Sequence, residues 1–125
     1  MKASRSLTVP IRGLAYHVRV WGEQHAPKVF MLHGWMDVGA SFQFLVDALE
    51  RDWCVIAPDW RGFGQSAWCA DGYWFADYIA DLEAILDVFA PCEPARLVGH
   101  SLGGNVVMHY AGSRKIGRAS CRERV

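Results

Sequence analysis

The sequence lacks an excess of charge of either sign and lacks any long apolar run. Its 125 residues carry 13 lysines and arginines against 13 aspartates and glutamates. There is no basic block before the tail that would attract nucleic acid or anionic lipid. No stretch approaches the roughly 18 apolar residues of a membrane span, and the basic start lacks a signal peptide's apolar core. We therefore expect a cytoplasmic protein with a small-molecule partner, and neither nucleic acid nor a membrane as partner.

Cysteine is scarce as well, and its four positions fit no metal-binding or redox pattern. Cys54, Cys69, Cys92 and Cys121 form no C-x-x-C pair and no metal-ligand spacing with histidine. The glycine-rich loops contain neither G-x-G-x-x-G nor G-K-[ST], so nucleotide binding has little support. We expect no metal and no organic cofactor.

Four short segments have the patterns of β-strands. Residues 14–21, LAYHVRVW, alternate apolar side chains with others such as His17, which indicates a half-buried strand. The apolar runs at 28–33, 53–58 and 96–100 are continuous, which is typical of strands covered on both faces.

The segments between these strands have helical periodicity. In residues 75–90 the apolar side chains recur on one stripe, and the aspartates, Asp81 among them, lie off it. Residues 42–50 are predicted to form a helix capped by Ser41, and residues 102–111 another. Strands that alternate with helices pair in parallel through crossover connections. The sequence therefore predicts one α/β domain.

The stretch LVGHSLGGNVV, residues 97–107, places Ser101 between an expected strand and an expected helix. Residues 99–103 fit G-x-S-x-G in the strand-turn-helix context that this motif requires. The turn needs strained backbone angles and flanking glycines, and it lifts the hydroxyl clear of the sheet. The backbone N–H of Leu102 then points to where an oxyanion would form. The alternative is a serine that only forms a tight turn or caps the helix.

Three motifs together resemble the α/β-hydrolase family, in its serine-hydrolase branch. They are LHGWMD at 32–37, PDWRGFGQS at 58–66 and GHSLGG at 99–104, within a resemblance that covers about residues 10–112. The family's strand order is 1-2-4-3-5-6-7-8. The resemblance thus implies an α/β-hydrolase fold, here the N-terminal part of a mostly parallel sheet flanked by helices and truncated after the nucleophile elbow helix.

The resemblance also implies roles for individual residues. Ser101 matches the family's nucleophile, and the backbone N–H groups of Leu102 and Trp35 match its oxyanion donors. Structural roles are implied for the other motif positions, which are His33, Gly34, Gly99, His100, Gly103, Asp59, Arg61, Gly62 and Gly64. For Asp59 and Arg61 the alternative is a plain surface ion pair, and we favour the structural role.

No histidine of the sequence is expected to act as the general base for Ser101, although a serine hydroxyl needs such a base held by a carboxylate. His100 precedes Ser101 on the turn and cannot reach round to its hydroxyl, and His109 lies about 12 Å further along the helix. Structural or solvent roles are favoured for the other three, His17, His25 and His33. The family supplies its acid and histidine after later strands, so we expect both to be absent.

The last ten residues, IGRASCRERV, resemble the in-frame translation of a common sequencing-library adapter. We therefore expect a partial hydrolase domain at 1–115 and a non-native tail at 116–125, with a nucleic-acid-binding basic tail as the alternative. The strand at 96–100 would then be an exposed apolar edge. The isolated chain is expected to be poorly soluble or partly molten.

Three hypotheses about function follow. The first is an N-terminal fragment of a serine hydrolase that cleaves an ester or similar acyl bond through an acyl-enzyme intermediate, inactive as this fragment. The second is a carbon-carbon hydrolase, lactonase or perhydrolase of the same fold, and the third is a non-catalytic ligand-binding relative or an inert product. The serine argues against the dehalogenase and epoxide-hydrolase branches, which use aspartate. An apolar or aromatic acyl substrate is indicated by aromatic residues around the expected cleft, namely Trp35, Phe42, Phe44, Trp68, Tyr73 and Trp74.

Overall fold

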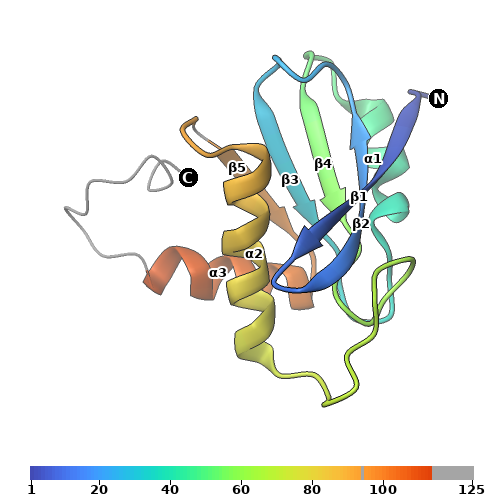
Figure 1. The fold of residues 1–125 in the computed structure, drawn as a ribbon. Helices are drawn as coiled ribbons and strands as arrows, with labels where there is room; N and C mark the ends of the chain where they lie inside the picture. The colour runs from blue at the N-terminus through green and yellow to red at the C-terminus, as the bar shows by residue number, and fades with distance from the viewer. Residues whose placement is uncertain (94, 114–125) are drawn as a thin grey trace.

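The computed structural model describes residues 1–93 and 95–113 (Figure 1). Within them the elements follow in the order β1 (Ser4–Ile11), β2 (Leu14–Trp21), β3 (Lys28–Leu32), the 3₁₀ turn η1 (Gly39–Phe42), α1 (Gln43–Ala48), β4 (Cys54–Pro58), α2 (Phe75–Phe89), β5 (Ala95–Gly99) and α3 (Leu102–Ser113). The predicted adapter-like tail at 116–125 lies outside the described residues.

The strands form one mixed sheet in the order β1-β2-β4-β3-β5. β4, β3 and β5 pair in parallel, as expected for strands joined through helices. β1 pairs antiparallel with β2, and β2 pairs antiparallel with β4. This order agrees with the first five strands of the α/β-hydrolase arrangement, so the predicted fold class is confirmed.

The sequence patterns do not predict β1. Its eight residues, SRSLTVPI, are mostly exposed and show no clean alternation, because the strand lies at the edge of the sheet. A two-residue turn joins it to β2, and both turn residues, Arg12 and Gly13, have positive φ angles, 47° and 82°. Such a turn matches the right-handed twist of a hairpin, which makes the pairing antiparallel.

Helices cover both faces of the sheet. α2 and α3 lie on one face and α1 lies on the other (Figure 1). Because successive strand residues point to opposite faces, β3 contributes Phe30 and Leu32 to the core under α2 and α3. It contributes Val29 and Met31 to the core under α1. The strand is thus buried on both faces, as its continuous apolar run predicts.

The predicted cap of the first helix is wrong. Ser41 belongs to η1, and α1 begins only at Gln43, with Phe42 before it and no side-chain cap. The Ser41 hydroxyl instead donates to the Asp37 carboxylate. None of the described helices has the length and apolar character needed to cross a bilayer.

The strand at the other edge of the described sheet is β5, and it is the expected apolar edge. Val98 is 40% exposed there.

An open apolar edge strand pairs readily with other chains, so we expect the 125-residue chain to associate, and Val98→Lys to increase its monomer fraction. Size-exclusion chromatography with light scattering measures that fraction. A sharp, reversible, two-state melt of monomeric parent chain would contradict the expectation.

Candidate active site

Ser101 lies at the corner between β5 and α3. Its φ angle is 54°, in the left-handed region, and its side chain is exposed. Its carbonyl accepts a hydrogen bond from the Asn105 N–H at 3.0 Å, so α3 begins directly after it. A non-glycine residue in this region costs about 1–3 kcal/mol and persists only where its surroundings fix it. Ser101 therefore occupies a strained strand-to-helix turn.

Glycines let α3 approach the end of β3 backbone to backbone. A Cβ atom on Gly103 would lie 2.0 Å from the carbonyl oxygen of Leu32, and one on Gly99 would lie 2.5 Å from the Gly103 carbonyl carbon. The Leu32 carbonyl also accepts a hydrogen bond from the His100 N–H at 3.0 Å. These contacts leave no room for any side chain at positions 99 and 103.

The loop after β3 passes beside Ser101. A Cβ atom on Gly34 would lie 3.0 Å from Ser101 Cβ and 3.1 Å from His100 Nδ1. Trp35 is the next residue, so its backbone N–H adjoins the glycine that lies against Ser101. At the start of α3 the Gly103 N–H donates to the His100 carbonyl at 3.0 Å. The Leu102 N–H precedes it at the N-terminus, where N–H groups have no acceptor within the helix. The two segments predicted to supply oxyanion donors thus meet at Ser101.

His33 anchors this loop and is fully buried. Its Nε2 accepts from the Trp60 N–H at 2.9 Å, and its Nδ1 donates to the Gly34 carbonyl at 2.7 Å. The Trp60 indole in turn donates to the His33 carbonyl at 3.0 Å. Burial lowers the pKa of His33, which favours the neutral ring that this pattern of one donor and one acceptor requires.

Asp59 and Arg61 are both buried, and each has its own partners, so the alternative of a plain surface ion pair is wrong. Asp59 accepts from the backbone N–H groups of Gly39 at 2.7 Å and Gln65 at 3.0 Å. It also pairs with His17 Nδ1 at 2.9 Å. The carboxylate thereby ties two loops beside the site to β2.

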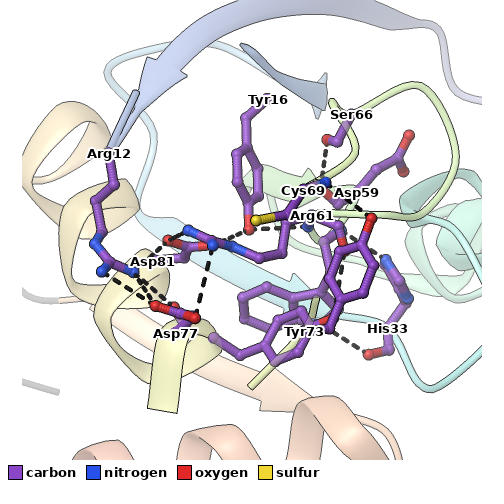
Figure 2. Close-up of polar contacts among 12 residues, drawn as sticks. Arg12, Tyr16, His33, Asp59, Arg61, Ser66, Cys69, Tyr73, Asp77 and Asp81 are labelled. Carbon is purple, nitrogen blue, oxygen red and sulfur yellow. Dashed lines mark hydrogen bonds and ion pairs between the residues drawn. The ribbon is translucent and has the colours of Figure 1, made fainter. Parts of the chain in front are cut away.

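Arg61 pairs with Asp81 of α2 through two hydrogen bonds, Nε to Oδ2 at 2.6 Å and Nη2 to Oδ1 at 2.7 Å (Figure 2). Arg12 donates to the same carboxylate at 3.0 Å, and the Tyr16 hydroxyl donates to it as well. The hydrogen bonds to Asp81 raise the pKa of Arg61. Asp81 is fully buried, so its predicted place off the apolar stripe is wrong. Its spacing of three residues from Tyr78 could have placed it on the buried face.

The loop between β4 and α2 turns tightly at two glycines with positive φ angles. Gly64, at 52°, lies against Asp59, where a Cβ atom would be 2.4 Å from the carboxylate oxygen. Gly62, at 83°, lies under the Tyr73 ring, where a Cβ atom would be 2.5 Å from the ring. These close approaches shape the loop beside the site.

A cavity of about 180 Å³ opens beside this loop. It is lined by Trp35, Gly62, Phe63, Tyr73 and Tyr78. The Trp35 and Phe63 rings meet edge to face, with centroids 5.0 Å apart. The cavity is therefore mainly aromatic and borders the residue after Gly34.

Only two of the six aromatic residues expected around the cleft, Trp35 and Tyr73, line this cavity. Phe42 packs in the core under α1, on the opposite face of the sheet. The remaining three, Phe44, Trp68 and Trp74, are exposed. Phe63 and Tyr78 also line the cavity and were not among the six predicted aromatic residues, although Phe63 lies inside the PDWRGFGQS motif.

Within residues 1–93 and 95–113, no hydrogen bond joins Ser101 to a histidine. His109 bonds the Asn105 carbonyl of its own helix at 2.8 Å, and His25 is exposed. In the same residues no group of three histidines, cysteines or carboxylates could hold a metal ion.

Several known proteins named as hydrolases are similar to this chain in sequence or fold. The chain is 35% identical over 107 residues to a serine hydrolase-like protein of Danio rerio, covering 84% of this chain and 32% of that protein. It is 39% identical over 100 residues to a pimeloyl-[acyl-carrier protein] methyl ester esterase of Vibrio atlanticus, covering 78% of this chain and 34% of that one. The chain thus spans about a third of the length of these curated relatives.

Among solved structures, the thioesterase domain from the curacin biosynthetic pathway superposes with a TM-score of 0.83 at 25% identity. The match covers 90% of this chain and 42% of that domain. The sequence profile described as alpha/beta hydrolase fold matches residues 27–119, which include the three motifs. The chain belongs to the alpha/beta hydrolase fold family.

Proposed function

We propose that this chain carries the nucleophile and the oxyanion donors of a serine hydrolase that cleaves an ester or similar acyl bond. Ser101 attacks the acyl carbon, and the N–H groups of Leu102 and Trp35 stabilise the oxyanion that forms. The observation that carries the proposal is the strained turn at Ser101, with φ 54°, held against Gly34. A serine with strained backbone angles and an exposed side chain at the N-terminus of a helix fits a nucleophile better than a plain helix cap.

In this proposal a general base and its orienting acid complete the catalytic site, and both come from outside the described residues. The order serine, acid, histidine of this family puts both after the elbow helix α3. The Vibrio relative is named as a methyl ester esterase and the solved domain as a thioesterase, which are both names for acyl-bond hydrolysis. These names support acyl transfer to water as the reaction.

The substrate in this proposal is a small compound with an apolar or aromatic acyl group. The cavity beside Trp35 supports this choice, since its lining residues Phe63, Tyr73 and Tyr78 are aromatic. At about 180 Å³ it accommodates a small group rather than a whole drug-sized ligand.

A fluorophosphonate probe tests the role of Ser101. We expect little or no labelling of Ser101 in the 125-residue chain, because no histidine activates it. In a protein expressed from the uninterrupted reading frame beyond codon 114, we expect the probe on the peptide that contains Ser101, as mapped by mass spectrometry, and Ser101→Ala is expected to abolish labelling of that peptide. Ser41→Ala, at an exposed serine, is the matched control and leaves labelling unchanged.

The longer protein also distinguishes the other hypotheses. If it contains a downstream acid and histidine but Ser101 stays unlabelled, the proposal is wrong. If it lacks them and still binds acyl compounds, the non-catalytic relative is correct. Carbon-carbon cleavage without ester hydrolysis would support the second hypothesis.

A further inference from the structure

A second serine of the chain is hydrogen-bonded to a histidine and a carboxylate. Ser6 Oγ lies 3.0 Å from His17 Nε2, and His17 Nδ1 lies 2.9 Å from Asp59 Oδ2. Ser6 belongs to β1 and His17 to β2, which pair antiparallel. This is the order of contacts by which a Ser-His-Asp triad activates its hydroxyl: nucleophile to base, and base to carboxylate.

The hydrogen bond to the Asp59 carboxylate fixes the tautomer of His17. A carboxylate only accepts hydrogen bonds, so the proton of the neutral ring is on Nδ1, facing Asp59. Nε2 then has a free lone pair and accepts the Ser6 hydroxyl proton. Asp59 itself is held by the N–H groups of Gly39 at 2.7 Å and Gln65 at 3.0 Å, so it cannot turn away from the ring.

The histidine and the carboxylate of this group are buried and its serine is exposed, as catalysis requires. His17 and Asp59 are 5% and 2% exposed, whereas Ser6 lies on the surface. Acyl compounds can therefore reach the Ser6 hydroxyl while its base stays shielded from water. β1 is also an edge of the described sheet, and the outward N–H groups of an edge strand can donate to an oxyanion.

We propose that Ser6 is a second nucleophilic serine, which His17 and Asp59 activate toward small activated esters and thioesters. The Ser6 oxygen forms a bond to the acyl carbon as its proton passes to His17 Nε2. The bond to the leaving alcohol or thiol then breaks, and that group takes the proton from His17. Water attacks the acyl-serine with His17 as base, which releases the carboxylic acid and restores the hydroxyl.

Ser4 provides an internal control for this proposal. It lies two residues earlier on β1, so its side chain points to the same side of the strand. Its hydroxyl oxygen accepts from Arg19 Nη1 at 2.9 Å, which is a cation and cannot take a proton. Ser4 and Ser6 thus share strand and direction and differ in the partner of the hydroxyl, and Ser4 is half-buried whereas Ser6 is exposed.

The experiment treats the 125-residue chain carrying Ser101→Ala with p-nitrophenyl acetate and maps acetylated peptides by mass spectrometry over time. General-base catalysis contributes about 100-fold or more, so we expect Ser6 to be acetylated about 100 times faster than Ser4. His17→Gln is expected to lower the Ser6 rate to that of Ser4. Circular dichroism establishes that both proteins keep their secondary structure.

Equal rates at Ser6 and Ser4 in the folded chain would overturn the proposal, and that comparison needs no substitution at His17. An unchanged Ser6 rate in folded His17→Gln would overturn it as well. Because Ser101 is absent from both proteins, neither outcome depends on the function proposed for the elbow.

Discussion

Replacing Asp81 with alanine is expected to destabilise the chain by about 3–5 kcal/mol, because it leaves the buried Arg61 cation with only the longer ion pair to Asp77, at 3.8 Å. Arg61 is 5% exposed, and both of its short hydrogen bonds go to this carboxylate. Without them the guanidinium must either stay charged in a desolvated site or pull the β4–α2 loop toward water. The loss is comparable to the whole stability of a small domain. We therefore expect Asp81→Ala to lose the tertiary structure around the candidate site.

Pulse proteolysis in urea measures this loss in dilute solution, where association through β5 is slow. Asp87→Ala is the matched control, since it removes an exposed carboxylate from the same helix. It is expected to change stability by less than about 0.5 kcal/mol. If both variants resisted proteolysis like the parent chain, the ion pair would not be holding the loop.

A double variant separates the unpaired charge from the lost packing. Replacing a buried ion pair by apolar residues of similar size is often neutral. Arg61→Met combined with Asp81→Leu is therefore expected to recover part of the stability that Asp81→Ala loses. Recovery would show that the uncompensated guanidinium dominates the cost. A double variant less stable than Asp81→Ala would instead show that Arg61 stabilises the chain even without Asp81, since both variants lack the Tyr16 and Arg12 hydrogen bonds to that carboxylate.

The sequence predicted those parts of the fold whose causes are local. Apolar runs gave β3, β4 and β5 to within a residue at each end, and helical spacing gave α2 and α3. β1 was not predicted, because a mostly exposed edge strand shows no regular alternation of apolar and polar residues in its sequence. Its antiparallel partner comes from a two-residue turn, Arg12-Gly13, that lacks the usual Asn-Gly or Asp-Gly signal.

In the candidate site too, features with a local cause were predicted and contacts between distant residues were not. The G-x-S-x-G spacing predicted the strained turn, because its cause is a sharp strand-to-helix corner. The polar contacts behind the site join residues far apart in the chain: His17 lies 42 residues from Asp59, and Arg61 lies 20 residues from Asp81. No local pattern encodes such pairs. The chain shows Asp81 only as an aspartate in a helix, and His17 only as a polar residue in a strand.

Gly103→Ala is expected to be the most damaging single methyl addition in α3. The new Cβ atom would lie 2.0 Å from the Leu32 carbonyl oxygen and 2.8 Å from the His33 carbonyl oxygen. Both are backbone atoms at the end of β3, so no side chain can turn aside to relieve the overlap. We expect a loss of about 3 kcal/mol or more, at the upper end of overpacking costs. The helix must move away from β3 and carry Ser101 away from Gly34.

Gly112→Ala makes the same chemical change in the same helix where nothing lies within 4 Å of the new atom. Alanine is favoured over glycine in a helix by up to about 1 kcal/mol, so this variant is expected to be slightly more stable than the parent chain. Pulse proteolysis of the two variants side by side compares them. Opposite signs would show that position 103 is restricted by the backbone of β3 rather than by helix propensity. Similar small effects at both positions would mean that α3 does not pack against β3 as closely as the elbow requires, and the nucleophile proposed at Ser101 would lose its physical basis.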